Sequence, residues 1–206
     1  MKKIPTVFVR DEQQRNLVTR VVTPGCEWVL MGEGVATLKW NGTACLVREG
    51  QIFARFDAHR DPPPPDFLPA EARDEIGGHW LGWLPVRDHS KYKYHREAFE
   101  SYQRAFEKYG TFPDGLKDGT YELCGPKVPP ARGDIPNPHG FADHRLLPHG
   151  TVPLDALNNG PRSYEMLQQF FAMQTSYLEG VVFWRNDEPG AKIKASDFGL
   201  RPRTGA

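Results

Sequence analysis

Short apolar or alternating stretches, separated by glycine, proline and charged turns, recur along the chain and predict β-strands. Residues 34–47 read as a strand, a tight glycine turn and a second strand, which predicts a hairpin with Lys39 at its bend. A second hairpin is expected over 179–194, with its turn at 186–190. Further strands are expected at 6–9, 17–22, 51–56 and 119–125.

Two stretches have the 3.6-residue period of amphipathic helices instead. The first covers 89–108, is expected to end at Gly110, and carries one apolar stripe formed by Tyr92, Phe99, Tyr102, Phe106 and Tyr109. The second follows Ser163, whose hydroxyl is a suitable N-cap. These stripes are expected to face a core rather than a ligand.

Composition narrows the class of protein. The 206 residues are enough for one sizeable core or at most two small ones. With 26 basic and 26 acidic residues the net charge is zero, so nucleic-acid binding would have to rest on local clusters. The three cysteines are isolated and odd in number, which suits a reducing compartment. No signal peptide or membrane-length apolar run is seen, so we expect a soluble cytoplasmic protein without a membrane partner.

Lys39 is the first candidate for chemistry. It follows Val35 and Leu38, and Gly42 lets the backbone approach a neighbour closely. An amine among apolar residues loses its proton more easily and can become a nucleophile. The alternative is a surface lysine beside a turn.

Two further positions on predicted strands are charged among apolar neighbours. Arg55 shares a strand face with Phe53, and is either a solvent-facing charge or an anion ligand. Glu122 lies within the strand 119–125, and a buried carboxylate is costly unless it is paired or binds something. Glu122 is therefore a stronger candidate than an ordinary surface glutamate.

Strand alternation places Lys192 and Lys194 on one face of the last predicted strand. Two like charges side by side repel unless an anion lies between them, and phosphate is the obvious anion. The alternative is a pair of solvated lysines that protect a sheet edge. The histidines at 139, 144 and 149 recur every five residues, which fits no metal-binding face, and we interpret them as structural.

Five segments together resemble the nucleotidyltransferase domain of the ATP-dependent ligase superfamily. In the order of that family, over residues 34–200, they are Lys39-Trp-Asn-Gly42, Ala54-Arg-Phe-Asp57, Glu122-Leu-Cys-Gly125, Glu179-Gly-Val-Val-Phe183 and Lys192-Ile-Lys194. Within the superfamily the chain resembles the small RNA ligases most, because Ala44 stands where DNA ligases and capping enzymes usually have arginine. Asn41 stands at the frequent acidic position of the first motif.

The resemblance implies an α+β fold in which antiparallel sheets with flanking helices form an ATP-grasp-like ligase adenylation domain. It implies one adenylyltransferase domain over 1–206, with no C-terminal OB-fold or helical domain. The implied substrates are ATP and RNA ends, with Mg²⁺ or Mn²⁺ as cofactor, and no obligate protein partner is evident.

The resemblance also implies a role for each site residue. Lys39 would be the nucleophile, and Glu179 would bind the metal. The nucleotide would be bound by Leu38, Gly42, Arg55, Glu122, Phe141 (the candidate for stacking on adenine), Lys192 and Lys194. The implied activity is sealing of RNA 5′-phosphate and 3′-hydroxyl ends through lysyl-AMP and adenylylated RNA. The alternatives are an adenylyltransferase or capping-type enzyme that does not seal strands, and a non-catalytic RNA-binding module that uses Trp80 and Trp83.

Overall fold

The computed structural model describes residues 3–59, 62–74, 78–109, 116–128 and 137–201, with the backbone alone for 105–109. The chain forms two compact units. Unit 1 consists of Asn41–Pro148, and unit 2 consists of Lys3–Trp40 together with His149–Ala206. Antiparallel sheets with a few helices make the fold α+β, so the expected class is confirmed at this level.

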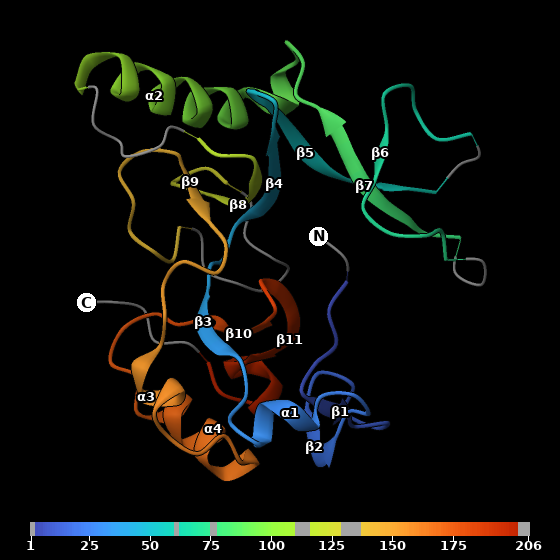
Figure 1. The fold of residues 1–206 in the computed structure, drawn as a ribbon, viewed down its shortest axis with the longest axis vertical. Coiled ribbons are helices and arrows are strands. Elements are labelled where there is room, and N and C mark those ends of the chain that lie inside the picture. Colours follow the sequence, from blue (N-terminus) through green and yellow to red (C-terminus); the bar gives the residue numbers. More distant parts are fainter. Residues whose placement is uncertain (1–2, 60–61, 75–77, 110–115, 129–136, 202–206) are drawn as a thin grey trace. The chain divides into compact units, whose positions relative to one another are not determined.

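Unit 2 contains a three-stranded sheet in the order β11-β10-β3 and a separate β1-β2 pair (Figure 1). Its elements are β1 (Phe8–Arg10), β2 (Val18–Val22), α1 (Glu27–Leu30), β3 (Val35–Lys39), α3 (Asp155–Asn158), α4 (Tyr164–Ala172), β10 (Gly180–Arg185), β11 (Glu188–Lys194) and the 3-10 helix η2 (Ala195–Phe198).

One face of the three-stranded sheet packs on the core of unit 2. Its core-facing residues are Ala36, Val181, Phe183, Ala191 and Ile193, which pack in one cluster with Leu167 and Phe171 of α4. Ser163 caps α4 as expected, accepting a hydrogen bond from the amide of Met166. Because side chains alternate along a strand, the polar residues of β3 and β11 project from the other face.

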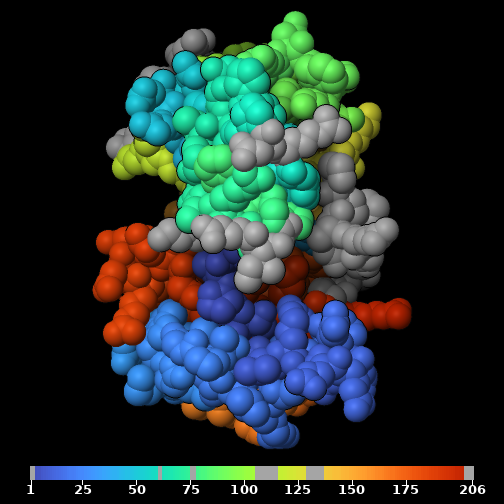
Figure 2. Space-filling model, turned by 90° about the vertical axis from the view of Figure 1, so that its right-hand side faces the viewer, coloured from blue at the N-terminus to red at the C-terminus, as the bar shows by residue number. Residues whose placement is uncertain are grey.

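Unit 1 is built on a six-stranded antiparallel sheet in the order β6-β7-β5-β4-β8-β9, with α2 packed against β9 and β5 (Figure 1). Its elements are β4 (Thr43–Arg48), β5 (Gln51–Ala58), β6 (Leu68–Pro69), β7 (Trp80–Pro85), the 3-10 helix η1 (Ser90–Tyr92), α2 (Lys93–Tyr109), β8 (Gly119–Cys124) and β9 (Arg145–Pro148). Figure 2 shows atoms of the segments from β5 to β7, cyan to green, on one face of unit 1.

The core of unit 1 lies between the sheet and α2. Cys45, Tyr121 and Leu123 from the strands are buried there, and Phe99 and Tyr102 of α2 pack against them. The expected helix and its apolar stripe are thus confirmed for the described side chains. The prediction also named Phe106, Tyr109 and Gly110, which lie outside the described side chains.

The hairpin predicted over 34–47 is wrong. Both strands exist, but β3 pairs with β10 in unit 2, whereas β4 pairs with β5 and β8 in unit 1. The close approach expected at Gly42 is confirmed, because a Cβ there would clash with the main-chain carbonyl oxygen of Leu123. Glycine is therefore required where the chain enters β4 beside β8.

The hairpin over 179–194 is confirmed, but its turn is shorter than expected. β10 pairs with β11 from Gly180 opposite Lys194 to Arg185 opposite Glu188, so only Asn186 and Asp187 form the turn. Both have positive φ, 53° and 60°, as the two central residues of a type I′ hairpin turn require. Pro189, expected in the turn, lies in β11 beside a register shift. Among the described helices, none is long and apolar enough to cross a membrane.

Candidate functional site

A cluster of charged residues occupies the polar face of the three-stranded sheet in unit 2. Lys39 at the end of β3 and Lys194 at the end of β11 both lie opposite Gly180 of β10. Residues opposite each other in antiparallel strands share a face, and glycine between them leaves room for two long side chains. The register therefore brings together two lysines that are far apart in the sequence.

Glu179, immediately before Gly180, joins the two lysines. Its Oε2 lies 2.6 Å from the Nζ of Lys39, and its Oε1 lies 2.5 Å from the Nζ of Lys194. The carboxylate side chain is only 5% exposed, and the two lysine side chains are 22% and 27% exposed. A buried carboxylate with both oxygens paired is well satisfied, while each ammonium keeps part of its surface open.

Lys192 lies two residues before Lys194 and on the same face, as predicted. It is not a solvated edge lysine, because its main chain bonds to the N-terminal segment: its amide donates to Pro5 O, and its carbonyl accepts from Val7 N. Burial, together with the charges of Lys39 and Lys194, lowers the pKa of Lys192. A desolvated cation next to two others is a site where an anion would be stabilised.

A polar clamp that the sequence did not reveal holds the start of β3. Asn158 bonds both the amide and the carbonyl of Ala36. Arg162, 1% exposed, donates to the carbonyls of Leu157, Glu33 and Gly34 and to Asn158 Oδ1. This arginine caps main-chain carbonyls rather than a carboxylate, so it fixes the backbone of the strand that carries Lys39. No local signal in the sequence marks it.

The candidates of unit 1 form a second cross-strand row. Glu122 of β8 lies opposite Ala44 of β4, and Arg55 of β5 lies opposite Trp83 of β7. The β4-β5 register, with Cys45 opposite Ala54, brings Ala44 opposite Arg55 one step further along. With strands about 4.8 Å apart, the backbones at Glu122 and Arg55 are about 10 Å apart on the same face. The small side chain of Ala44 lies between them.

The surroundings of these two charged residues differ. Glu122 is buried, as predicted from its apolar neighbours. Arg55 is not a fully solvent-facing charge, which was the simpler of its two interpretations. It is half-buried, and its guanidinium lies 4.9 Å from the ring centre of Trp83. Burial lowers its pKa. Trp83 itself is buried, so it supports Arg55 and is not available as an exposed stacking platform.

Phe141 and Leu38 are both partly buried. Phe141 lies in the loop before β9, with the Arg145 guanidinium 5.2 Å from its ring centre. Leu38 packs against the core of unit 2, and its amide donates to Val152 O. Their roles toward a nucleotide stay predictions.

The predicted structural histidines are held by other residues. His139 Nε2 accepts a hydrogen bond from the amide of Asn41, and His144 pairs with Glu97 while stacking on Tyr94. A group that the sequence did not reveal is Asp57, His59 and His79 in unit 1. The spacing of Asp57 and His59 on one strand was a usable signal, but their pairing with His79 was not.

Comparisons of the chain with protein-family models and with curated proteins found no match.

Proposed function

We propose that the protein is an ATP-dependent RNA ligase in which Lys39 forms the covalent adduct with AMP. The observation that carries the proposal is the arrangement around Glu179: a lysine amine on a buried carboxylate, with two more lysines on the same sheet face. A nucleophilic amine surrounded by cations suits attack on a phosphate ester, where negative charge builds on oxygen.

The first step can be written with the residues present. The Nζ of Lys39 forms a bond to the α-phosphorus of ATP, the bond from that phosphorus to the bridging oxygen breaks, and pyrophosphate leaves. An ammonium cannot attack, so the amine must first lose a proton. The nitrogen loses two protons in all, one before the attack and one as its bond to phosphorus forms. Glu179 Oε2, hydrogen-bonded to this amine at 2.6 Å, would pass both to solvent and remain a carboxylate.

Lys192 and Lys194 would stabilise the charge on the α-phosphate. Both project from the same face as Lys39, and burial already disfavours the charged form of Lys192. An incoming phosphate removes that penalty, so the pair binds the anion without having to reorganise. The roles that the resemblance implies for Arg55 and Glu122 of unit 1, including a contact of Glu122 with the ribose hydroxyls, stay predictions.

Magnesium, implied by the resemblance, would be held by Glu179. Mg²⁺ is commonly bound by one or two carboxylates together with substrate phosphates, so a single glutamate is a sufficient protein ligand. Both oxygens of Glu179 are paired with ammonium groups, so a cation fits there only when one lysine gives up its charge. Lys39 gives up its charge earlier, as the neutral amine that attacks ATP. Bound Mg²⁺ would supply further neutralisation of the phosphate oxygens.

The test is incubation with α-labelled ATP and Mg²⁺, followed by denaturing electrophoresis. We expect an acid-labile AMP adduct on the wild-type chain and none on Lys39→Arg, which keeps the positive charge but cannot supply a neutral amine. Lys192→Ala and Lys194→Ala should lose roughly a hundredfold or more in labelling, as is typical for a transition-state charge contact. Labelled GTP should react far more slowly.

Matched controls separate chemistry from folding. Lys93→Ala removes an exposed lysine of α2 and should label normally. The lowered pKa of Lys192 means that its buried charge costs stability below that pKa, so Lys192→Ala should unfold at no lower a temperature than wild type. Wild-type labelling of Lys39→Arg would contradict the assignment of the nucleophile. An adduct without sealing of 5′-phosphorylated RNA would favour an adenylyltransferase that does not join strands.

A further inference from the structure

We propose that Asp57, His59 and His79 of unit 1 bind one divalent transition-metal ion, with Zn²⁺ as the reference case. This site differs from the nucleotide-linked metal position at Glu179, and the proposed function does not use it. Each of the three residues offers one atom that can bind a metal, and these atoms all lie within 4.8 Å of one another. Among the described residues, no other group of three or more His, Cys, Asp or Glu side chains meets this condition.

The sheet explains why the three residues meet. Asp57 and His59 are two residues apart at the end of β5, so they project from the same face. In the β5-β7 register Ala58 lies opposite Trp80, and the next step along brings His59 opposite His79. Residues opposite each other share a face as well, so all three side chains emerge on one side at the end of two paired strands.

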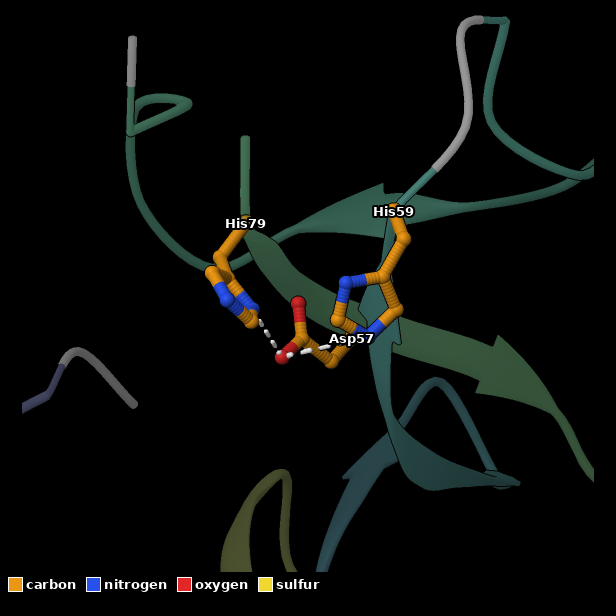
Figure 3. A group of neighbouring side chains, drawn as sticks. All are labelled: Asp57, His59 and His79. Carbon is orange, nitrogen blue, oxygen red and sulfur yellow. Dashed lines mark hydrogen bonds and ion pairs between the residues drawn. The ribbon is translucent and has the colours of Figure 1, made fainter. Parts of the chain in front are cut away.

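The side chains point toward one another (Figure 3). His79 Nδ1 lies 2.8 Å and His59 Nε2 lies 3.7 Å from the same carboxylate oxygen, Asp57 Oδ2. The centres of the two imidazole rings are 4.6 Å apart, and the rings are arranged edge to face. The other oxygen, Asp57 Oδ1, is buried and has no hydrogen-bond partner within the described part of the chain. The carboxylate therefore keeps lone pairs for a ligand.

The geometry needs only a small adjustment to accept an ion. Ligand atoms bonded to one Zn²⁺ at about 2.0–2.2 Å lie about 3–4 Å from one another. The histidine side chains are 62% and 51% exposed, so their rings are free to turn by that amount, whereas Asp57 is 34% exposed and more firmly placed. The carboxylate would fix the ion, and the two rings would close on it.

The donor set selects the class of metal. Two imidazole nitrogens and one carboxylate suit Zn²⁺, Fe²⁺, Co²⁺ or Ni²⁺, whereas Mg²⁺ and Ca²⁺ prefer oxygen ligands. Three protein ligands leave at least one coordination position for water or substrate, which is the pattern of catalytic rather than structural zinc sites. The exposed side of the cluster leaves that position accessible.

The competing explanation is an ion pair that only joins the ends of β5 and β7. Metal titration of the full-length, tag-free chain after removal of bound metal separates the two, without ATP or RNA present. We expect calorimetry to show one Zn²⁺ per chain with micromolar or tighter affinity, unaffected by millimolar Mg²⁺. Co²⁺ should give a visible spectrum without thiolate charge-transfer bands, because all three cysteines are buried.

Variants locate the ion. Asp57→Asn, His59→Ala and His79→Ala should each weaken Zn²⁺ binding by at least about tenfold, the loss typical even of outer-shell partners. His89→Ala, an exposed histidine outside the cluster, should bind as wild type does. The folding of each variant is first checked by its thermal unfolding. If a histidine variant does not fold, the nearly isosteric Asp57→Asn still tests the proposal. No binding by the wild type, or equal binding by all variants, would overturn the proposal.

Discussion

Burial decides what individual titratable side chains of this protein do. Lys192 has its pKa lowered by desolvation and by neighbouring lysines, which in the proposed function would favour a bound anion. His95 is buried as well, but its ring contacts Tyr92 edge-on, and neither ring nitrogen has a hydrogen-bond partner within the described residues. Burial lowers the pKa of His95 to about 4. Burial would thus favour anion binding at Lys192 in the proposed function, whereas at His95 it costs stability in acid.

His95 should make unit 1 sensitive to acid. The unfolded chain binds the proton with a pKa of about 6.5, and the folded chain binds it only near the lowered value. Between these two values the unfolded state holds more protons, so stability falls as pH falls, by about 3 kcal/mol over the whole range. Urea unfolding at neutral pH and near pH 5 should show about 2 kcal/mol of this loss in wild type and not in His95→Leu.

The control for this prediction is His89→Leu. His89 is exposed, so its replacement should leave the pH dependence of wild type in place. If His95→Leu and His89→Leu lost stability equally on acidification, the effect would not originate at His95.

At the scale of elements, the position of Lys39 depends on parts of the chain remote from it. β10 sets the register of β3, and the clamp of Asn158 and Arg162 holds the first residues of that strand. The clamp comes from α3 and the segment before α4. These helices therefore contribute to the site without carrying a candidate catalytic residue.

Arg162→Met should be strongly destabilising. It leaves the carbonyls of Leu157, Glu33 and Gly34 without their donor, and a buried unsatisfied polar group costs about 1–3 kcal/mol, so we expect a total loss of about 3 kcal/mol or more. Denaturant unfolding measures it. Arg185→Met is the matched control: this arginine is exposed and pairs with the Glu33 side chain, so its loss should cost about 1 kcal/mol or less. Equal costs for the two variants would rule out the clamp.

At the scale of the whole molecule, charge is balanced and local. The chain has no net charge, so binding of nucleic acid through its phosphates would have to rest on local basic clusters. The sites of interest are small clusters, each within one of the two units. Recognition of an RNA end would therefore depend on a few contacts.

The salt dependence of RNA binding tests this view. If about two or three phosphates are neutralised, the logarithm of affinity for a 5′-phosphorylated single strand should fall with the logarithm of salt with a slope of about −1.4 to −2.1. Fluorescence anisotropy at several salt concentrations gives the slope. Lys93→Ala removes an exposed lysine outside the proposed site and should not change it. A wild-type slope steeper than about −5 would indicate an extended basic surface instead.

What the sequence determined by itself is local. The alternation of side chains along a strand predicted that Lys192 and Lys194 share a face. The 3.6-residue period of apolar residues predicted α2, and Ser163 marked the start of α4. These features depend on neighbours within a few residues, which the sequence displays directly. The buried state of Glu122 could be anticipated in the same way, from the apolar residues beside it.

The tertiary structure alone decided which segments meet. β3 and β4 are adjacent in sequence yet belong to different sheets, because each finds its partner strands elsewhere in the chain. Lys39 meets Glu179 across 140 residues, and Arg162 meets the start of β3 across 128. His79 joins Asp57 from the neighbouring strand. Pairing and burial are set by the competition of all segments for partner strands and for burial in either core, and no local pattern records its outcome.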